Sequence, residues 1–421
     1  MTLTDTQARK GIAFRDMSAS AFPPKAHGGS ASISVSWLSG GDLDTILPAW
    51  RALADNACEP NPFFEAHMLR PALEHLKGGR QVQVLAVFDA ADPTFLIGLM
   101  PVRIRSTYRG IPLKTAEPWK HIHGFLATPL LRKGHEDAAL HGIIGALKAR
   151  KVKLIRFHHA AADGAFARTL DAIIAHERLA ARTTRSFERA ILASSLDGDA
   201  YLANSISKKK RKEFGRLGRR LADEGVVEFE TADLTDAAAV EGVALEFMEL
   251  ERSGWKGRRG TAMAQRPQEM RFFLNACRMA AARGNLYPLT LRVDGAPVAS
   301  IVNFAGGGAD GTGLFSFKIA YDESFARHSP GVLLELELTA RALSMPCMAF
   351  TDSCANPDHP MIDHLWRERR AMRDINVATG PAVPSALIRL TAALEHGIAA
   401  FKARTYRYRA DLGTWLNRRS S

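Results

Sequence analysis

The stretch "FKIAYDESFARHSPGVLLELEL", from Phe317 to Leu338, decides the fold. Its first residues end an apolar β-strand, and Ser-Pro-Gly then opens a leucine-rich helix with proline at the first helical position. Between the two elements the chain gathers cations, a phenol and carboxylates. Because ligands of open α/β sheets bind beyond the ends of strands, this junction is the first candidate for a functional site.

The residues around the junction predict strands and helices in alternation. Two apolar segments flank Asp294-Gly295, a strong turn signal, and predict a hairpin over 286–304. A helix is expected over 330–345, followed by a short buried strand over 346–353. This alternation is typical of an α/β protein.

The same order of elements occurs earlier in the chain. Residues 81–89 and 95–106 predict a hairpin, 135–151 a helix and 152–159 a buried strand. The repeat predicts a tandem duplication of one α/β module. Between the copies lies a helical insert, whose first helix is expected over 199–225.

The composition is that of a folded protein with an excess of positive charge. The 421 residues are 46% hydrophobic and 24% charged, and the formal net charge is +12. A chain of this length exceeds one ordinary core and predicts two or three domains. The charge suits phosphate-bearing or otherwise acidic partners, and it equally suits solubility alone, because net charge governs association and not fold.

Cysteine usage and hydropathy indicate a compartment. Cys58, Cys277, Cys347 and Cys354 form no C-x-x-C pair and are expected to be reduced thiols. The first residues lack the apolar core of a signal peptide, and no apolar run approaches the roughly 18 residues of a membrane span. We therefore expect a cytoplasmic protein without a transmembrane segment.

The two ends of the chain differ from its middle. Residues 1–32 are rich in Ser, Ala, Gly and Pro and predict a flexible tail. Residues 385–419 predict an amphipathic, basic helix, which either packs on the body or lies on a membrane surface. Packing on the body is the commoner outcome and the one we expect.

The start of the helix at residue 330 has the features of an anion site. A helix N-terminus presents unpaired N–H groups and a partial positive charge. Ser329 is a natural N-cap, Pro330 takes the first helical position, and Gly331 lets a ligand approach the backbone. Arg327 and His328 add positive or proton-donating character, so together these residues suit a pyrophosphate. An ordinary capped helix, which needs only the serine and the proline, is the structural alternative.

The equivalent helix of the first copy lacks these features. It opens with "RKGHEDA", which places Glu136 and Asp137 in the first turn. These carboxylates stabilise a helix N-terminus but repel a bound phosphate. An anion site of the fold therefore belongs to the second copy.

Polar side chains converge just before this anion site. Lys318, Tyr321 and Asp322 lie at the end of the strand, and Asp352 ends the strand that follows the helix. A phenol can give a proton to a leaving group, and a carboxylate can take or orient one. The structural alternative is a core tyrosine beside ordinary turn carboxylates, but four polar groups at one predicted edge favour a catalytic site.

These residues resemble a known family. The opening stretch, with "FTDSCANPDHPMIDHLWRERR" (350–370) and "ERSGWKGRRGTA" (251–262), resembles the bacterial GNAT-like acyltransferases. The closer match is the CelD or BioF2-like group, which is associated with cellulose and exopolysaccharide synthesis. That group is in turn similar to the Fem aminoacyltransferases, which contain two tandem GNAT modules. The first half agrees mainly in layout, and in "NPFFE" (61–65) and "HGFLATPLL" (123–131).

The resemblance implies transfer of an acyl group from acyl-CoA, such as acetyl-CoA, to an amine or hydroxyl of a cell-envelope or polysaccharide-related acceptor. It implies that the donor pyrophosphate binds at the helix after the central strand, to Arg327, His328, Ser329, Pro330, Gly331 and Val332. Here "RHSPGV" replaces the usual Arg/Gln-x-x-Gly-x-Gly/Ala loop, and a Fem-like aminoacyl-tRNA is the alternative donor. A non-catalytic accessory protein of a polysaccharide-synthesis complex is the alternative outside enzymes.

The resemblance also implies roles for the polar side chains. Asp352 is the candidate base or nucleophile-orienting group, Tyr321 the acid for the leaving group, and Lys318 a contact to an acidic acceptor or to the donor phosphate. Backbone N–H groups around 315–317 would bind the developing oxyanion. The candidate acceptor-binding residues are Glu251, Trp255, Lys256 and Asp322.

The expected architecture is α/β, with tandem duplicated GNAT-like modules, each a mixed sheet flanked by helices, and a helical insert between them. Residues 1–32 form the tail and 33–195 a first module with a degenerate donor site. Residues 196–421 form the second module with the insert and the C-terminal helix. The expected partner is a small-molecule, glycan or peptide acceptor.

Three other patterns carry less weight. "KKKRK" (208–212) suits nucleic acid, above all tRNA, but it lies in an amphipathic helix, where a charge run is usually a solvated face. "AGGGADGTG" (305–313) lacks the Lys-Ser/Thr of a phosphate loop and predicts a hairpin connection. Two groups of metal-ligating residue types have no recognised ligand spacing: His121 with His123, and Cys354 with His359 and His364. We therefore expect no metal.

Overall fold

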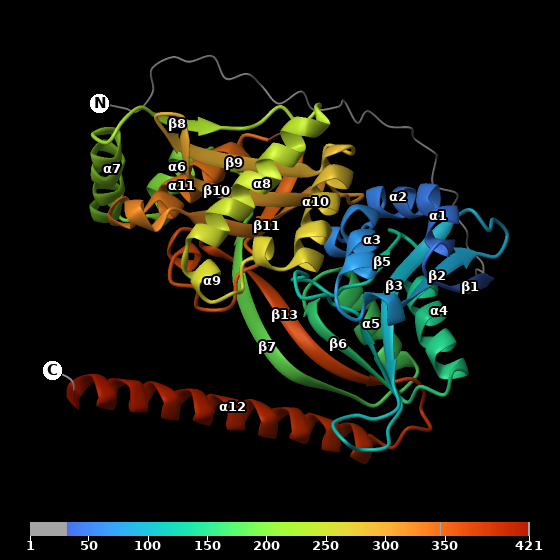
Figure 1. The fold of residues 1–421 in the computed structure, drawn as a ribbon. Coiled ribbons are helices and arrows are strands. Elements are labelled where there is room, and N and C mark those ends of the chain that lie inside the picture. The colour runs from blue at the N-terminus through green and yellow to red at the C-terminus, as the bar shows by residue number, and fades with distance from the viewer. Residues whose placement is uncertain (1–31, 346, 420–421) are drawn as a thin grey trace.

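The computed structural model describes residues 32–345 and 347–419. The tail predicted over 1–32 lies, apart from residue 32, outside these residues. The described strands form one mixed sheet of thirteen strands in the order β1-β2-β3-β4-β6-β13-β7-β12-β11-β10-β9-β8, with β5 paired to β3 (Figure 1). The α/β fold class is confirmed.

The strands divide between the two copies. Those of the first copy are β1 (Ile33–Leu38), β2 (Gln83–Asp89), β3 (Leu96–Arg105), β4 (Thr115–Pro118), β5 (Leu130–Leu131), β6 (Leu154–Ala161) and β7 (Ala181–Leu192). Those of the second copy are β8 (Val227–Glu230), β9 (Leu286–Val293), β10 (Ala296–Gly306), β11 (Thr312–Tyr321), β12 (Met348–Asp352) and β13 (Glu368–Ala378).

The helices follow the same division. The first copy contributes α1 (Asp42–Thr45), α2 (Leu47–Asp55), α3 (Ala66–His75), α4 (Glu136–Ala149) and α5 (Ala165–His176). The second contributes α6 (Gly198–Ser205), α7 (Lys208–Ala222), α8 (Ala237–Ser253), α9 (Trp255–Arg258), α10 (Pro267–Ala281), α11 (Pro330–Leu343) and α12 (Ser385–Arg419). A 3-10 helix, Glu323–His328, joins β11 to α11.

The strand order shows the duplication directly. From one edge of the sheet the first copy runs β1-β2-β3-β4-β6, and from the other the second runs β8-β9-β10-β11-β12. In each run the hairpin is antiparallel and the last pair is parallel. The two remaining strands are exchanged: β13 of the second copy pairs with β6, and β7 of the first pairs with β12. The copies are therefore joined through the middle of one sheet.

Local sequence signals placed these elements well, with one correction. Both predicted hairpins form, and the Asp294-Gly295 turn has positive φ at both residues, as a two-residue hairpin turn requires. The single helix expected over 199–225 is wrong, because the chain breaks it into α6 and α7. The break is stabilised by Ser207, whose side chain accepts a hydrogen bond from the N–H of Lys210 and so caps α7.

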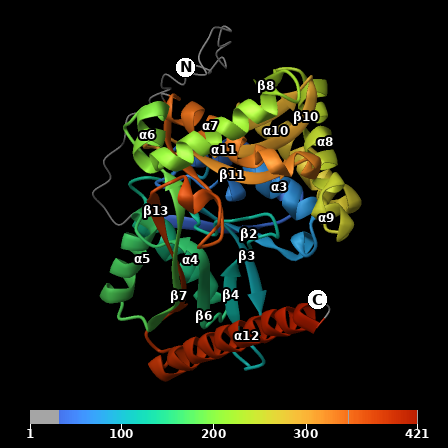
Figure 2. The same cartoon turned by 90° about the vertical axis from the view of Figure 1, so that its left-hand side faces the viewer.

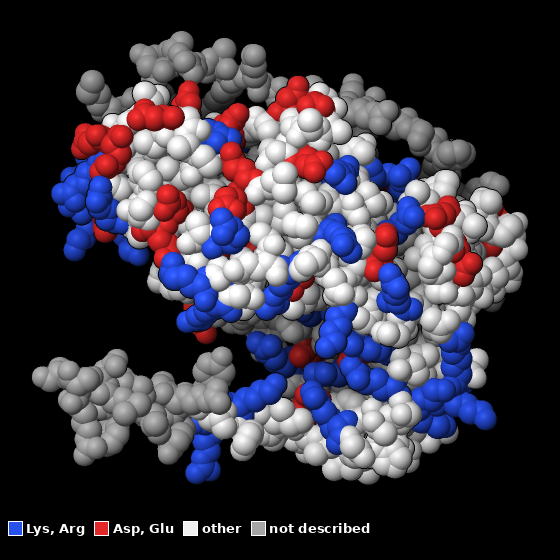
Figure 3. Space-filling view, viewed as in Figure 1, with Lys and Arg blue, Asp and Glu red and all other residues white. Residues whose placement is uncertain are grey.

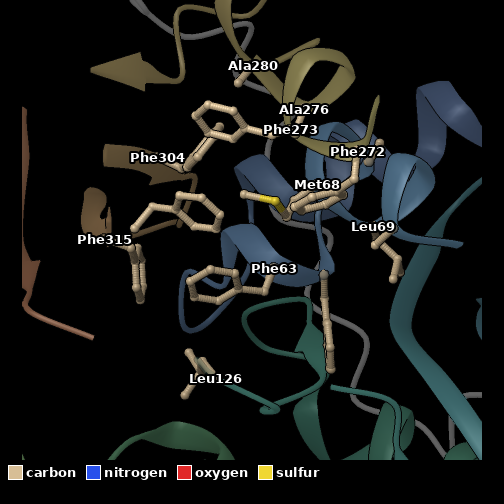
Figure 4. Packing of buried hydrophobic residues seen from close by; sticks show 14 of the residues in the cluster. Phe63, Met68, Leu69, Leu126, Phe272, Phe273, Ala276, Ala280, Phe304 and Phe315 are labelled. Atoms are coloured by element: carbon tan, nitrogen blue, oxygen red, sulfur yellow. The ribbon is translucent and has the colours of Figure 1, made fainter. Parts of the chain in front are cut away.

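An aromatic core lies between the copies. Phe63 of the first copy meets Phe315 of β11 edge to face, with ring centroids 5.8 Å apart (Figure 4). Phe125 meets Phe317 with centroids 6.2 Å apart. Phe63, Phe315 and Phe317 belong to a buried cluster that also covers α3, α8 and α10, and Phe125 packs against it. Because burying one phenylalanine contributes roughly 2 kcal/mol, this cluster fixes the second copy against the first.

The "NPFFE" segment is the polar part of the same joint. Asn61 donates a hydrogen bond to the carbonyl of Thr128, at 2.7 Å, and Glu65 accepts one from the N–H of Gly307, at 2.8 Å. Gly307 belongs to the glycine-rich segment, which connects β10 to β11 as the hairpin prediction required. At Gly306 an added Cβ would lie 2.8 Å from Pro62, so glycine allows this close approach.

The last helix packs on the body by its first turns. Ile388 and Thr391 of α12 are buried, and the Thr391 hydroxyl accepts a hydrogen bond from Asn376 of β13 at 3.0 Å. Figure 2 shows α12 at the end of the molecule opposite α7 and α8. In the part of the chain that the structure describes, no helix is long and apolar enough to cross a bilayer. The four cysteines are free thiols, as expected.

Candidate functional site

The sheet opens where β11 and β12 part. The two strands pair from Thr312 with Met348 to Phe315 with Asp352, where β12 ends, while β11 continues to Tyr321. Over its last residues β11 therefore has no partner among the described strands on this side. We call this opening the β11–β12 notch, bounded by β11 from Ser316 to Tyr321, by Asp352 and by the start of α11.

A β-bulge lies at the notch. In the pairing with β10, Lys318 faces Val302 and Ser316 faces Asn303, so Phe317 is the extra residue. A bulge interrupts the hydrogen-bond ladder and re-aims the backbone. The segment 315–317, from which the sequence predicted an oxyanion site, thus lies at the point where the ladder is irregular on one side and open on the other.

The start of α11 closes the far end of the notch. Ser329 adopts a left-handed conformation, with φ 50°, and its side chain makes no capping hydrogen bond. The cap predicted from its hydroxyl is therefore wrong: the backbone carbonyl of Ser329 instead accepts from the N–H groups of Val332 and Leu333. Gly331 lies against β11, since a Cβ added there would be 3.5 Å from Ile319 and 3.9 Å from Tyr321.

The two basic residues before this helix meet at one carboxylate, Glu224, which follows α7. The Arg327 side chain is 68% exposed and donates to Glu224 at the end of α7, at 2.6 Å. His328 is buried beside Phe325, and its Nε2 accepts a hydrogen bond from Arg327. The guanidinium is thus exposed but paired with Glu224, and the buried imidazole lies 3.3 Å from the same carboxylate.

Three of the predicted residues meet in one ion cluster. Glu251 of α8 is buried, and one of its carboxylate oxygens contacts Lys256 at 2.8 Å and Lys318 at 3.2 Å. Its other oxygen accepts the N–H of Met263 at 2.8 Å. Burial would raise the pKa of Glu251, but the two lysines and the N–H outweigh burial and lower this pKa below its usual range. Burial also lowers the pKa of Lys318.

The acceptor-side candidates lie beside this cluster. Trp255 is 48% exposed, and its ring lies near the charged groups of Lys256 and Arg259. The backbone N–H of Trp255 donates a hydrogen bond to Glu323, which connects α9 to the 3-10 helix before the predicted anion site. Asp322 caps that 3-10 helix by accepting from Ser324, which is the ordinary turn role. Tyr321 is partly exposed.

Asp352 lies at the notch but is enclosed. Its side chain is fully buried, and Oδ2 accepts from Arg189 at 2.7 Å and from Arg370 at 2.9 Å. Oδ1 accepts the N–H of Cys354. Burial would raise the pKa of Asp352, but the two arginines lower it below its usual range. A carboxylate held in this way is a weak base without access to a ligand, so these contacts favour a positioning role.

The sequence did not predict the contact between His123 and Glu269. His123 Nε2 lies 3.0 Å from Glu269 of α10, and its ring stacks on Phe272 with centroids 5.3 Å apart. The positive charge of Lys318 acts on His123, and burial lowers the pKa of this histidine. The sequence suggested His123 only as a metal ligand with His121, because a contact between residues so far apart along the chain leaves no local signal.

In the first copy the matching opening is filled by the protein's own chain. After the pairs of β4 with β6, residues 119–129 lie along β6: Ala127 N–H donates to the carbonyl of His159, and Thr128 accepts from Ala161. Leu126 and Ala127 are fully buried. As expected, α4 of this copy has Glu136 and Asp137 in its first turn. Only the second copy therefore has an open notch beside a helix start free of carboxylates, within the described residues.

No metal cluster accompanies these groups. In residues 32–345 and 347–419, no three His, Cys, Asp or Glu side chains are arranged to hold a metal ion.

Comparison with known proteins found one matching family model and several similar folds. Residues 208–351, from α7 to β12, match the family model described as an acetyltransferase (GNAT) domain. No curated protein sequence matches the chain. The crystal structure of FemX is similar in fold, with a TM-score of 0.51, 10% identity, and coverage of 82% of this chain and 96% of FemX. A conserved protein of unknown function from Bacteroides thetaiotaomicron VPI-5482 has a TM-score of 0.50 and 12% identity, over 82% of this chain and 99% of that one.

Proposed function

We propose that the protein is an acyltransferase that moves an acyl group from an acyl-CoA thioester to an amine or hydroxyl of an acceptor. The observation that carries the proposal is the β11–β12 notch, which opens at the Phe317 bulge and leads to the start of α11. The match of residues 208–351 to the acetyltransferase (GNAT) domain supports it, because that segment contains β11 and the start of α11 and ends one residue before Asp352.

The donor would lie along the open edge of β11. Its acyl carbonyl would face the backbone N–H groups of 315–317, which would stabilise the negative charge that develops in the tetrahedral intermediate. Its phosphates would lie at the first turn of α11, where Gly331 packs against β11 without a side chain and Arg327 supplies a charge. In this arrangement the reacting carbon is held between the bulge and Tyr321.

The reaction balances without an acyl-enzyme. The acceptor nitrogen or oxygen bonds to the thioester carbon, the C–S bond breaks, and the sulfur leaves as a thiolate. Tyr321 gives its phenolic proton to the sulfur and regains one from the acceptor, so the residue is unchanged after a turnover. Asp352 acts as a positioning group that fixes Arg189 and Arg370 at the end of β12.

The acceptor would enter from the side of α9. Trp255 offers an exposed aromatic face, and the cluster of Glu251, Lys256 and Lys318 offers charges for an ionic group. The resemblance to the CelD or BioF2-like group supports an acceptor from the cell envelope or from polysaccharide synthesis. An exposed tryptophan beside lysines suits such a glycan or peptide.

Donor binding is tested by thermal unfolding of the full chain with acetyl-CoA and with free coenzyme A. A donor at a hundredfold excess over its Kd stabilises the folded state by about 2.7 kcal/mol, and the transition temperature rises accordingly. Arg327→Gln and Gly331→Ala are expected to reduce this rise, because they remove a charge and cover the backbone at the first turn of α11. Tyr321→Phe is expected to bind the donor normally and to turn over slowly.

The matched control is Gly145→Ala in α4. An added Cβ at Gly145 meets nothing within 4 Å, so this variant changes a helical glycine of the first copy and leaves the notch intact. It is expected to respond to acetyl-CoA as the unaltered protein does. Absence of any rise with either ligand in the unaltered protein would contradict the proposal.

A second donor, aminoacyl-tRNA, is favoured by one observation. The basic side chains of α7 are exposed, including those of Lys208 to Lys212, and Figure 3 shows Lys and Arg gathered at that corner of the molecule. The melting experiment separates the two donors. Stabilisation by tRNA and not by acetyl-CoA, lost on raising the salt concentration, would replace the first donor by the second.

A further inference from the structure

One group of cations lies outside the notch. The strands β6, β13 and β7 carry side chains on the face that α12 crosses, since Arg156 contacts Glu395 of α12 and its register partner Asn376 contacts Thr391. Asp374 and Met372 lie on the same face of β13, at the next two alternate positions. Their register partners on β7 are Arg185 and Phe187, respectively. Side chains paired in this way point to one side of a sheet.

These residues surround His159 at the end of β6. The ring of His159 packs against Phe187, with centroids 5.6 Å apart. The backbone N–H of His159 donates a hydrogen bond to Asp374 at 2.7 Å. Burial lowers the pKa of His159 to about 3, and four cations act in the same direction: Lys120, Arg185, Arg189 and Arg156. We call Lys120, Arg156, His159, Arg185 and Phe187 the α12-face site.

One carboxylate lies among the cations of this site: Asp374 is buried, lies 3.8 Å from His159 Nδ1 and acts electrostatically on Lys120. Arg185 is exposed and lies 4.3 Å from the centre of the Phe187 ring, with no ion pair among the described residues. Lys120 likewise forms no ion pair with the described residues, and its side chain donates a hydrogen bond to the carbonyl of Gly124. Arg156 reaches Glu395 at 3.3 Å, but that carboxylate is already bound by Arg109 at 2.9 Å.

Two further observations point to a ligand. The buried Nε of Arg156 and the buried Nδ1 atoms of His158 and His159 have no hydrogen-bond partner in the described part of the chain. Buried polar atoms are nearly always paired, so such a group calls for a missing partner. His159 also has φ 49°, a conformation that costs energy outside glycine and is typical of binding sites.

The positive charge beside α12 is visible on the surface. Figure 3 shows Lys and Arg side chains gathered, with few Asp or Glu among them, on the body of the molecule beside the first turns of α12. A phosphate suits this setting, because guanidinium groups bind its oxygens in pairs and a lysine adds a point charge.

We propose that the α12-face site binds the phosphate group of the acceptor. The site adjoins the notch through Arg189, one of the cations that act on His159. Arg189 donates hydrogen bonds to the carbonyl of Phe125 and to Asp352. The register partner of Asp352 is Phe315, where the notch begins. An acceptor held by its phosphate at Arg185 and Lys120 therefore extends toward the reacting carbonyl. Phosphate binding at these residues stands alone, and only its assignment to the acceptor rests on the proposed function.

The test is calorimetric titration of the full chain with inorganic pyrophosphate at low ionic strength. Arg185→Gln and Lys120→Gln are each expected to weaken pyrophosphate binding about tenfold, the loss typical of one hydrogen bond to a charged group. Arg51→Gln removes an exposed positive charge from α2, and it is expected to change the affinity little. Melting temperatures of the variants show that each is folded.

The donor site also binds phosphates under the proposed function, so Arg327→Gln is titrated in parallel. Loss of pyrophosphate binding in Arg185→Gln but not in Arg327→Gln supports the α12-face site, whether or not coenzyme A binds. Loss in Arg327→Gln alone, or no binding to the unaltered protein, overturns it. If coenzyme A does not bind, but pyrophosphate binding is still lost in Arg185→Gln, the proposed acyl-CoA donor is wrong and the phosphate site is supported.

Discussion

The carboxylate of Asp352 lies between two guanidinium groups in the middle of the protein. Two arginines and one aspartate without exposure form an arrangement in which each charge depends on the others. Removing one member of a buried ion pair leaves the remaining charges without compensation and without water. We therefore expect Asp352 to contribute mainly to the stability of the folded protein.

Asp352→Asn is expected to lower the free energy of unfolding by about 3 kcal/mol or more, because an amide cannot balance Arg189 and Arg370. Denaturant unfolding measures this loss. Asp322→Asn is the matched control, since the side chain of Asp322 caps a surface 3-10 helix and an asparagine oxygen caps equally well. Similar small losses in both variants would show that the buried pair contributes nothing special.

At the scale of elements, two serines precede helices and only one acts through its side chain. The Ser207 hydroxyl accepts from Lys210 at the start of α7, whereas Ser329 has a left-handed backbone and no capping side-chain bond. Ser207→Ala is expected to cost about 1 kcal/mol. Ser329→Gly is expected to be neutral or stabilising, because glycine adopts positive φ without strain.

Chemical denaturation of the two variants measures this difference. The same experiment on Ser207→Asp provides the control, since aspartate caps helices as well as serine does. A larger loss for Ser329→Gly than for Ser207→Ala would mean that the hydroxyl of Ser329 acts as the sequence alone suggested.

The elements also show what sequence can and cannot reveal. The hairpin at Asp294-Gly295 and the helix after Pro330 follow from signals within a few residues, and both form as predicted. The exchange of β7 and β13 could not be predicted, because it depends on pairing between strands far apart in the chain. For the same reason the sequence placed Lys318 and Glu251 in separate roles, although the fold puts them 3.2 Å apart.

At the scale of the molecule, the exchanged strands decide how the protein unfolds. Without β13 the strand β6 loses one of its two neighbours, and without β7 the strand β12 also loses one of its two. The aromatic joint of Phe63 with Phe315 adds a second connection. The boundary predicted between residues 195 and 196 remains a prediction, and it crosses this shared sheet.

We therefore expect one cooperative unfolding transition. Trp50 and Trp366 are both fully buried, the first in the core cluster between the copies and the second beside β7 and α11. Replacing either by phenylalanine removes the fluorescence of one of the six tryptophans, from a different part of the molecule in each case, and both variants should show coincident fluorescence and circular dichroism transitions. Phe63→Ala, which opens a cavity at the joint, should cost about 3 to 5 kcal/mol and still give one transition. Two separated transitions would mean that each copy is stable without the exchanged strand, since a shared central sheet cannot lose half its pairs and remain folded.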